Sequence, residues 1–269
     1  MVFRGFLVAA CGFLFVFAPG LSMGLVSRRL RGFKRDLLYW GIGIWLIAQF
    51  PANFFKNLLY GIALGNTSTL TDISKTESYL FPLMGALIAA FILEGSLYIY
   101  LRLKRRKTPI QLLDGLSLGF GSGLVAQVFT GLMLVGSGFR LVFGDTTGPI
   151  LSYLSQAPVL ELIIGLSVLV LFRATLLVVT GVIGVLVARA ITERLRYLWL
   201  AMIVEAAFVW IIMAIQLVLG VESPGSLSIG HVDLLGSVVA IVYYILVFGL
   251  AYRWLLSQSQ LLKEKHHQA

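Results

Sequence analysis

The chain has 269 residues, of which 59% are hydrophobic and only 12% charged, and its mean hydropathy is +0.94. This composition excludes a soluble globular protein and indicates an integral membrane protein. The formal net charge of +9 is distributed between apolar segments rather than gathered on one soluble face, so it does not indicate nucleic-acid binding.

Apolar segments follow one another along most of the chain, and each is long enough for the roughly 20 residues that a helix needs to cross hydrocarbon. The seven predicted spans are 5–27, 37–60, 80–101, 110–136, 168–190, 197–219 and 233–255. We therefore predict an all-α, polytopic transmembrane helix bundle. It forms a single integral membrane domain over residues 1–269, with a short polar cytoplasmic tail at 256–269.

Basic residues follow the first, third, fifth and seventh predicted spans, and these four flanks hold most of the 21 lysines and arginines. Cytoplasmic loops of membrane proteins carry such an excess of basic residues. We therefore expect the N-terminus outside, the C-terminus in the cytoplasm and the protein in the cell membrane.

The apolar run that begins at Pro158 is too long for one untilted span. An eighth crossing would leave one set of basic clusters outside, so residues 156–171 are predicted to form a helix against the outer leaflet. Short outer loops are expected at 61–79, 137–157 and 220–232, which are rich in Gly, Ser, Thr and Pro.

Two carboxylates fall inside apolar spans. Glu94 and Glu205 each lie about eight residues from the cytoplasmic end of a span, which places both near 12 Å into the hydrocarbon. Ionisable groups at this depth are costly and commonly functional, so both are candidate catalytic residues. The alternative is that protonated or hydrogen-bonded glutamates only tie helices together.

Other polar side chains fall at comparable depth or slightly farther out, toward the outer side of the membrane. Gln49, Ser122 and Thr180 complete a polar layer over five helices, and we assign Gln127 to the same network. Arg173 is placed near the outer end of its span. It either pairs with a glutamate or extends its guanidinium to the outer interface.

The fourth span carries Gly115, Gly119 and Gly123 on one face, four residues apart. Small residues at this spacing let a neighbouring helix approach closely, so we predict a helix-packing role. Direct contact with a ligand is the alternative.

Five segments of the chain follow one another in the order of a known set of motifs. They are WGIGIWLIAQFPANFF, ILEGSLYIYLRLKRRK, GLSLGFGSGLVAQVF, FRATLLVVTGVIGVLVARA and RYLWLAMIVEAAFVW. In this order they resemble the YhfC family of intramembrane peptidases, which is similar to the CPBP and PrsW membrane proteases. The resemblance implies an intramembrane peptidase fold in which Glu94 occupies the catalytic glutamate position.

The chain departs from this family at most of its charged and histidine positions. Only Glu94 and Arg173 retain the family's charged residues, and Glu205 stands where the family has a histidine. The other replaced positions are Gly95, Tyr98, Ala126, Phe172 and Thr180. Because a zinc protease needs about three converging ligands and no histidine lies in a span, we expect no metal and no cofactor.

Three functions remain open from the sequence. We favour a catalytically lapsed YhfC-like protein that binds a membrane helix, a lipid or a partner protein in an intramembrane cavity. The first alternative is an active glutamic-type protease, in which Glu94 and Glu205 act as base and acid. The second is a small-solute or proton-coupled transporter, for which the same two glutamates would be the protonatable pair.

Overall fold

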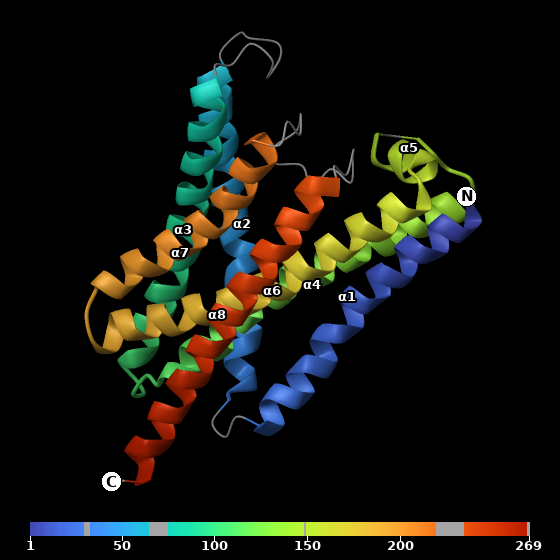
Figure 1. The fold of residues 1–269 in the computed structure, drawn as a ribbon. Coiled ribbons are helices and arrows are strands. Elements are labelled where there is room, and N and C mark those ends of the chain that lie inside the picture. The colour runs from blue at the N-terminus through green and yellow to red at the C-terminus, as the bar shows by residue number, and fades with distance from the viewer. Residues whose placement is uncertain (30–32, 65–74, 148, 219–233, 268–269) are drawn as a thin grey trace.

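The computed structural model describes residues 1–29, 33–64, 75–147, 149–218 and 234–267, and the regular elements in these ranges are all α-helices (Figure 1). The all-α prediction is confirmed for this part of the chain. The helices are α1 (Val2–Arg29), α2 (Arg35–Leu64), α3 (Lys75–Arg105), α4 (Leu112–Val142), α5 (Pro149–Gln156), α6 (Val159–Thr192), α7 (Arg196–Val218) and α8 (Leu234–His267).

Five of the helices contain stretches that are long and apolar enough to cross a membrane. These stretches are Arg35–Leu59 in α2, Leu83–Arg105 in α3, Leu112–Val142 in α4, Val159–Thr192 in α6 and Gly236–Gln258 in α8. A shorter apolar stretch, Val2–Phe17, belongs to α1. The helix lengths therefore agree with the membrane class that the composition indicates.

Helix α4 lies at the centre of the packing and contacts α1, α2 and α6 (Figure 1). Glycines allow these contacts, because the helix backbones come too close for a larger residue. A Cβ atom at Gly12 of α1 would stand 2.7 Å from the carbonyl oxygen of Gly131 in α4. A Cβ atom at Gly121 of α4 would stand 2.1 Å from the carbonyl oxygen of Leu38 in α2. Backbone approach through small residues is typical of membrane helices.

Of the remaining helices, α3, α7 and α8 form a second group, which packs onto α2 and α6. Helix α3 packs against α2 and α7, and α6 packs against α7 and α8. Their shared core includes Leu97 of α3, Ile183 of α6, Phe208 of α7 and Tyr244 of α8. Helix α6 joins the two groups, because it also packs against α4.

Basic residues predicted to lie in the cytoplasm gather at one end of the bundle. The Arg105 guanidinium at the end of α3 donates a hydrogen bond to the Ile191 carbonyl at the end of α6. Arg189 of α6 donates to the Gln258 side chain of α8, and its guanidinium carbon lies 5.6 Å from the ring centroid of Tyr197 in α7. The C-terminal ends of α3 and α6 therefore meet the start of α7, so α3 and α7 are antiparallel.

A buried carboxylate joins further elements at the same end. Asp114, in the first turn of α4, is fully buried, and its Oδ1 lies 2.8 Å from the Lys34 Nζ just before α2. Its Oδ2 accepts a hydrogen bond of 3.2 Å from the Gln111 backbone N–H. The Lys34 backbone N–H donates to the Ser117 hydroxyl at 3.2 Å. These contacts attach the start of α2 to the first turn of α4.

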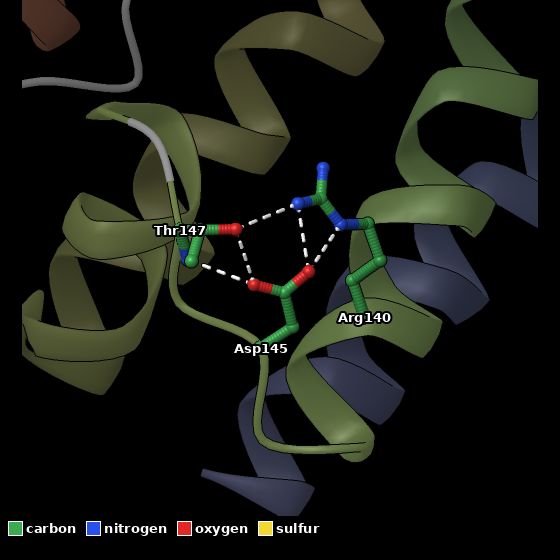
Figure 2. A network of polar contacts seen from close by, with 3 residues as sticks. All are labelled: Arg140, Asp145 and Thr147. Atoms are coloured by element: carbon green, nitrogen blue, oxygen red, sulfur yellow. Dashed lines mark hydrogen bonds and ion pairs between the residues drawn. The ribbon is translucent and has the colours of Figure 1, made fainter.

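At the opposite end, a compact polar network follows α4 (Figure 2). Arg140 Nε donates to Asp145 Oδ2 at 2.7 Å, and the Thr147 hydroxyl and backbone N–H donate to Asp145 Oδ1 at 2.6 and 2.9 Å. The Thr147 hydrogen bonds, with that of Arg140, lower the pKa of Asp145 from 3.8 to about 2. The network is therefore complete above pH 3.8 and is lost as the pH falls through about 2.

The predicted outer-leaflet helix at 156–171 is wrong, because these residues belong mostly to the single continuous helix α6. Leu162, Leu166 and Leu169 from this part pack with residues of α1 and α4. The only proline here, Pro158, stands just before the first turn, where it does not break a helix. The separate short helix is α5, which lies beside the N-terminus (Figure 1).

Two of the predicted outer loops also differ from the structure. The segment 137–157 is largely helical, because α4 continues to Val142 and α5 follows after a short connection. Helix α2 continues to Leu64 and α3 begins at Lys75, so both helices extend into the segment 61–79 that was predicted as a loop. The predicted loop at 220–232 lies outside the described residues, and the polar tail from 256 continues α8 as far as His267.

Candidate functional site

The two glutamates of the predicted spans meet where α3 packs against α7. Around them this interface is built from the small residues Ala86, Ala90 and Ala206, together with Met202. Small side chains let the two helices approach closely. Glu94, on α3, is only 1% exposed, and Glu205, on α7, is partly buried.

The carboxyl groups of Glu94 and Glu205 contact each other directly through a side-chain hydrogen bond. Two carboxyl groups can form such a bond only when one of them carries a proton. The Oε2 atom of each glutamate is buried, and no other described residue donates a hydrogen bond to it. The bond between the two carboxyl groups is therefore the polar contact that they make.

The chemistry open to this pair is set by its neighbours. Across the described residues, no group of three or more His, Cys, Asp or Glu side chains is arranged to hold a metal ion. Two carboxyl groups that share a proton can exchange it, and they can attract a cation.

Three of the other predicted polar residues bond within their own helices or stand apart. Ser122 donates to the Gly119 carbonyl at 2.7 Å, and Thr180 donates to the Leu177 carbonyl at 2.9 Å. Gln49 of α2 is half-buried. None of these contacts reaches the glutamates, so the described residues do not form one continuous polar layer.

Gln127 and Arg173 form a separate site between α4, α6 and α8. The Gln127 Nε2 donates to the Arg173 carbonyl oxygen at 2.8 Å. The carbon atom of the Arg173 guanidinium lies 5.2 Å from the Phe172 ring centroid, and the Phe172 ring in turn lies 5.5 Å from the Tyr244 ring of α8, centroid to centroid. The Arg173 Nε is buried without a hydrogen-bond partner. Arg173 thus lies beside the aromatic contact with α8, and among the described residues no ion pair joins it to either glutamate.

The three glycines of α4 face the backbone of α6. Cβ atoms at Gly115 and Gly119 would each stand 2.1 Å from a carbonyl oxygen, of Gly184 and Thr180 respectively. A Cβ atom at Gly123 would stand 2.3 Å from the Thr180 hydroxyl oxygen. These contacts leave no room for a ligand between the helices, so this face of α4 serves helix packing.

The structure also contains an apolar groove, which sequence reasoning missed and which neither glutamate lines. The groove has a volume of about 650 Å³ and runs between α2, α3 and α7. Six large apolar side chains on its walls are 42% to 59% exposed: Phe55, Leu58, Leu87, Phe91, Trp199 and Ile203. Because most residues around them in the sequence are also apolar, the hydrophobic pattern does not distinguish a groove wall from an ordinary lipid-facing surface.

The chain was compared with known proteins in three ways. No family model matches it, and neither a curated protein nor a solved structure matches it. The candidate site therefore has to be interpreted from its own geometry.

Proposed function

We propose that the chain is a multi-pass protein of the cell membrane with seven spans, its N-terminus outside and its C-terminus in the cytoplasm. Each of the seven predicted spans overlaps one long helix, and the basic flanks gather at one end of the bundle. The proposal includes the YhfC-like fold, for which the support is the ordered motifs of the sequence.

We infer that the protein binds a transmembrane helix of a substrate or partner in the groove between α2, α3 and α7. The observation that carries this inference is the groove itself, whose volume of about 650 Å³ falls within the range of ligand sites. In a bilayer, helix association depends on close packing rather than on the hydrophobic effect. A concave apolar wall therefore provides more contact for a helix than a flat one.

Binding without cleavage agrees best with the chemistry of the pair. A glutamic peptidase needs a group that stabilises the oxyanion as well as a carboxylate that activates water. The three histidines of the chain lie outside its predicted spans, and the contact of Glu94 is with another carboxyl group. This supports a lapsed catalytic site with a retained binding groove.

Filling the groove tests the proposal. The protein and a single-span peptide with an apolar core are labelled and reconstituted in liposomes, and their association is followed by energy transfer. Ile203→Trp adds bulk to the groove wall and should weaken association several-fold. Leu250→Trp, on α8 and 71% exposed, is the matched control and should leave it unchanged.

Equal loss in both variants, or no association with the unaltered protein, would contradict helix binding at the groove. Association of labelled lipid alone, with the same response to Ile203→Trp, would identify an acyl chain as the occupant instead.

A second candidate function is glutamic-type proteolysis, and the observation that favours it is the contact between the two carboxyl groups. A pair that shares a proton supplies a base and an acid in one place. If the pair is catalytic, Glu94→Gln and Glu205→Gln should each abolish cleavage of a reconstituted single-span substrate. Cleavage that persists in both variants would exclude this function.

A further inference from the structure

We propose that the basic end of the bundle binds the phosphate group of an anionic phospholipid at Arg189 of α6 and Arg196 of α7. This inference goes beyond the proposed function, because it concerns neither the groove nor the carboxyl pair. It follows from three features of the described residues: two guanidinium groups beside one aromatic ring, the shortage of acidic partners around them, and their place at the end of an apolar helix face.

The two guanidinium groups gather around Tyr197, where α6, α7 and α8 meet. The guanidinium carbon of Arg189 lies 5.6 Å from the Tyr197 ring centroid, and that of Arg196 lies 5.4 Å from it. The Arg189 guanidinium carbon also lies 5.9 Å from the ring centroid of Trp254 in α8. Tyr and Trp are the aromatic residues typical of membrane–water interfaces. The two charges therefore belong to one small site that three helices build.

Positive charge exceeds negative charge at this site. Arg196 is exposed, and it makes neither a hydrogen bond nor an ion pair with the residues that the structure describes. Glu193 is the acidic residue near Arg189, but its Oε1 lies 3.7 Å from the Arg189 Nε, which is beyond hydrogen-bond distance. That buried Nε has no hydrogen-bond partner. Arg194, between the two arginines in the chain, is also exposed. An added anion would therefore find guanidinium groups that one carboxylate does not neutralise.

The position of Arg196 on α7 places the site at the level of lipid headgroups. Arg196 is the first residue of α7, and Trp199 and Leu200, three and four residues further on, lie on the same face of the helix. Both side chains are apolar and are 57% and 44% exposed. Within about one turn, this face changes from a guanidinium group to side chains suited to hydrocarbon. The phosphate groups of lipids lie at this boundary, which favours a lipid over a soluble anion.

The excess of positive charge also selects among lipids. Phosphatidylglycerol carries a net negative charge, whereas the phosphate group of phosphatidylcholine is accompanied by its own cation. Basic clusters at the ends of spans attract anionic lipids, and basic pockets between spans hold their headgroups. A guanidinium group can also donate two parallel hydrogen bonds to one phosphate group. We therefore expect the site to prefer phosphatidylglycerol.

Lipid titration of the full chain tests this inference. The protein in an uncharged detergent is titrated with phosphatidylglycerol or phosphatidylcholine, and bound lipid is counted by native mass spectrometry. We expect phosphatidylglycerol to bind about tenfold more tightly. Each arginine contributes roughly fivefold, so Arg196→Gln should weaken phosphatidylglycerol binding about fivefold, and the double variant Arg189→Gln, Arg196→Gln about 25-fold. Binding of phosphatidylcholine should not change.

The matched control removes the same charge at the same end of the bundle. Arg106→Gln and Lys107→Gln replace two exposed residues just after α3, and this double variant should keep the preference for phosphatidylglycerol. Arg189 also donates a hydrogen bond to Gln258, so its replacement can affect folding. The single variant Arg196→Gln removes no such contact. Helicity and a single monodisperse species, checked for every variant, distinguish lost binding from lost folding.

Three results would overturn the inference. Equal binding of the two lipids to the unaltered protein would exclude an anionic headgroup site. An equal loss in the control variant would assign the attraction to the overall charge of this end. Displacement of the lipid by inorganic phosphate, or by a soluble polyglutamate peptide, at the same concentration would assign the two arginines to a soluble anion instead.

Discussion

At the scale of single residues, Asp114 is the clearest case of a charge used for structure. It is fully buried at the start of α4, yet its ion pair with Lys34 and its hydrogen bond from Gln111 use both carboxylate oxygens. Glu94 is buried almost as completely, but its contact is with the carboxyl group of Glu205 rather than with a cation. Two carboxyl groups that are buried to the same extent therefore differ in their partners.

Replacing Asp114 should show this structural role. Asp114→Ala removes the partner of Lys34 and the acceptor for the Gln111 N–H, so we expect a loss of about 3 kcal/mol in the free energy of unfolding. Titration with a denaturing detergent, followed by circular dichroism, measures it. Asp36→Ala removes an exposed carboxylate two residues after Lys34 and should cost about 0.5 kcal/mol or less. Similar losses for both variants would contradict a structural role for Asp114.

At the scale of helices, the contact between α4 and α6 depends on glycine rather than on large apolar side chains. A Cβ atom at Gly119 has to displace the Thr180 carbonyl, whereas one at Gly43 of α2 meets nothing within 4 Å. The two glycines look alike in the sequence, since both lie in glycine-rich apolar spans. Only the packing distinguishes them.

Substitution by alanine should separate these two glycines. Gly119→Ala forces α4 and α6 apart and should lower the free energy of unfolding by about 2 kcal/mol. Gly43→Ala should be neutral or stabilise by about 0.5 kcal/mol, because alanine favours helix more than glycine does. Detergent unfolding of the two variants side by side provides the measurement. A Gly119→Ala protein as stable as Gly43→Ala would refute the close contact.

The helices themselves could be predicted from apolar runs and basic flanks, but the course of α6 could not. The apolar run from Pro158 is longer than an untilted span needs, so it was predicted to contain two helices. This prediction separated residues 156–171 from the helix to which most of them belong. A continuous helix can exceed the hydrocarbon thickness when it tilts or extends beyond it. In Figure 1, α6 is inclined to α2 and α3. Tilt depends on neighbouring helices, which the local sequence does not specify.

In the candidate site too, the sequence identifies the unusual residues, whereas their contacts depend on how the helices pack. Glu94 and Glu205 stand out because charged residues are rare in apolar spans, and counting from the basic flanks places them at one depth. Their direct contact also requires α3 and α7 to pack against each other. Equal depth in the membrane does not predict which helices are neighbours. Ser122 and Thr180 were counted at similar depth, yet their hydroxyls bond to carbonyls of their own helices.

At the scale of the whole molecule, the arrangement of charges predicts an orientation. Because the basic flanks are at one end of the bundle, we expect that end in the cytoplasm. A C-terminal fusion to a fluorescent protein that folds only in the cytoplasm should be bright. The same reporter attached before Met1 should be dark, and the opposite result would reverse the proposed topology.

The central position of α4 also has a consequence for biosynthesis. Helix α1 packs mainly against α4, and α2 and α3 lie between them in the chain. A ribosome therefore delivers α1 to the membrane long before the helix that covers Gly5 and Gly12 has been made. Until then lipid must cover this glycine face, and the first helix can take its final place only after the fourth has been inserted.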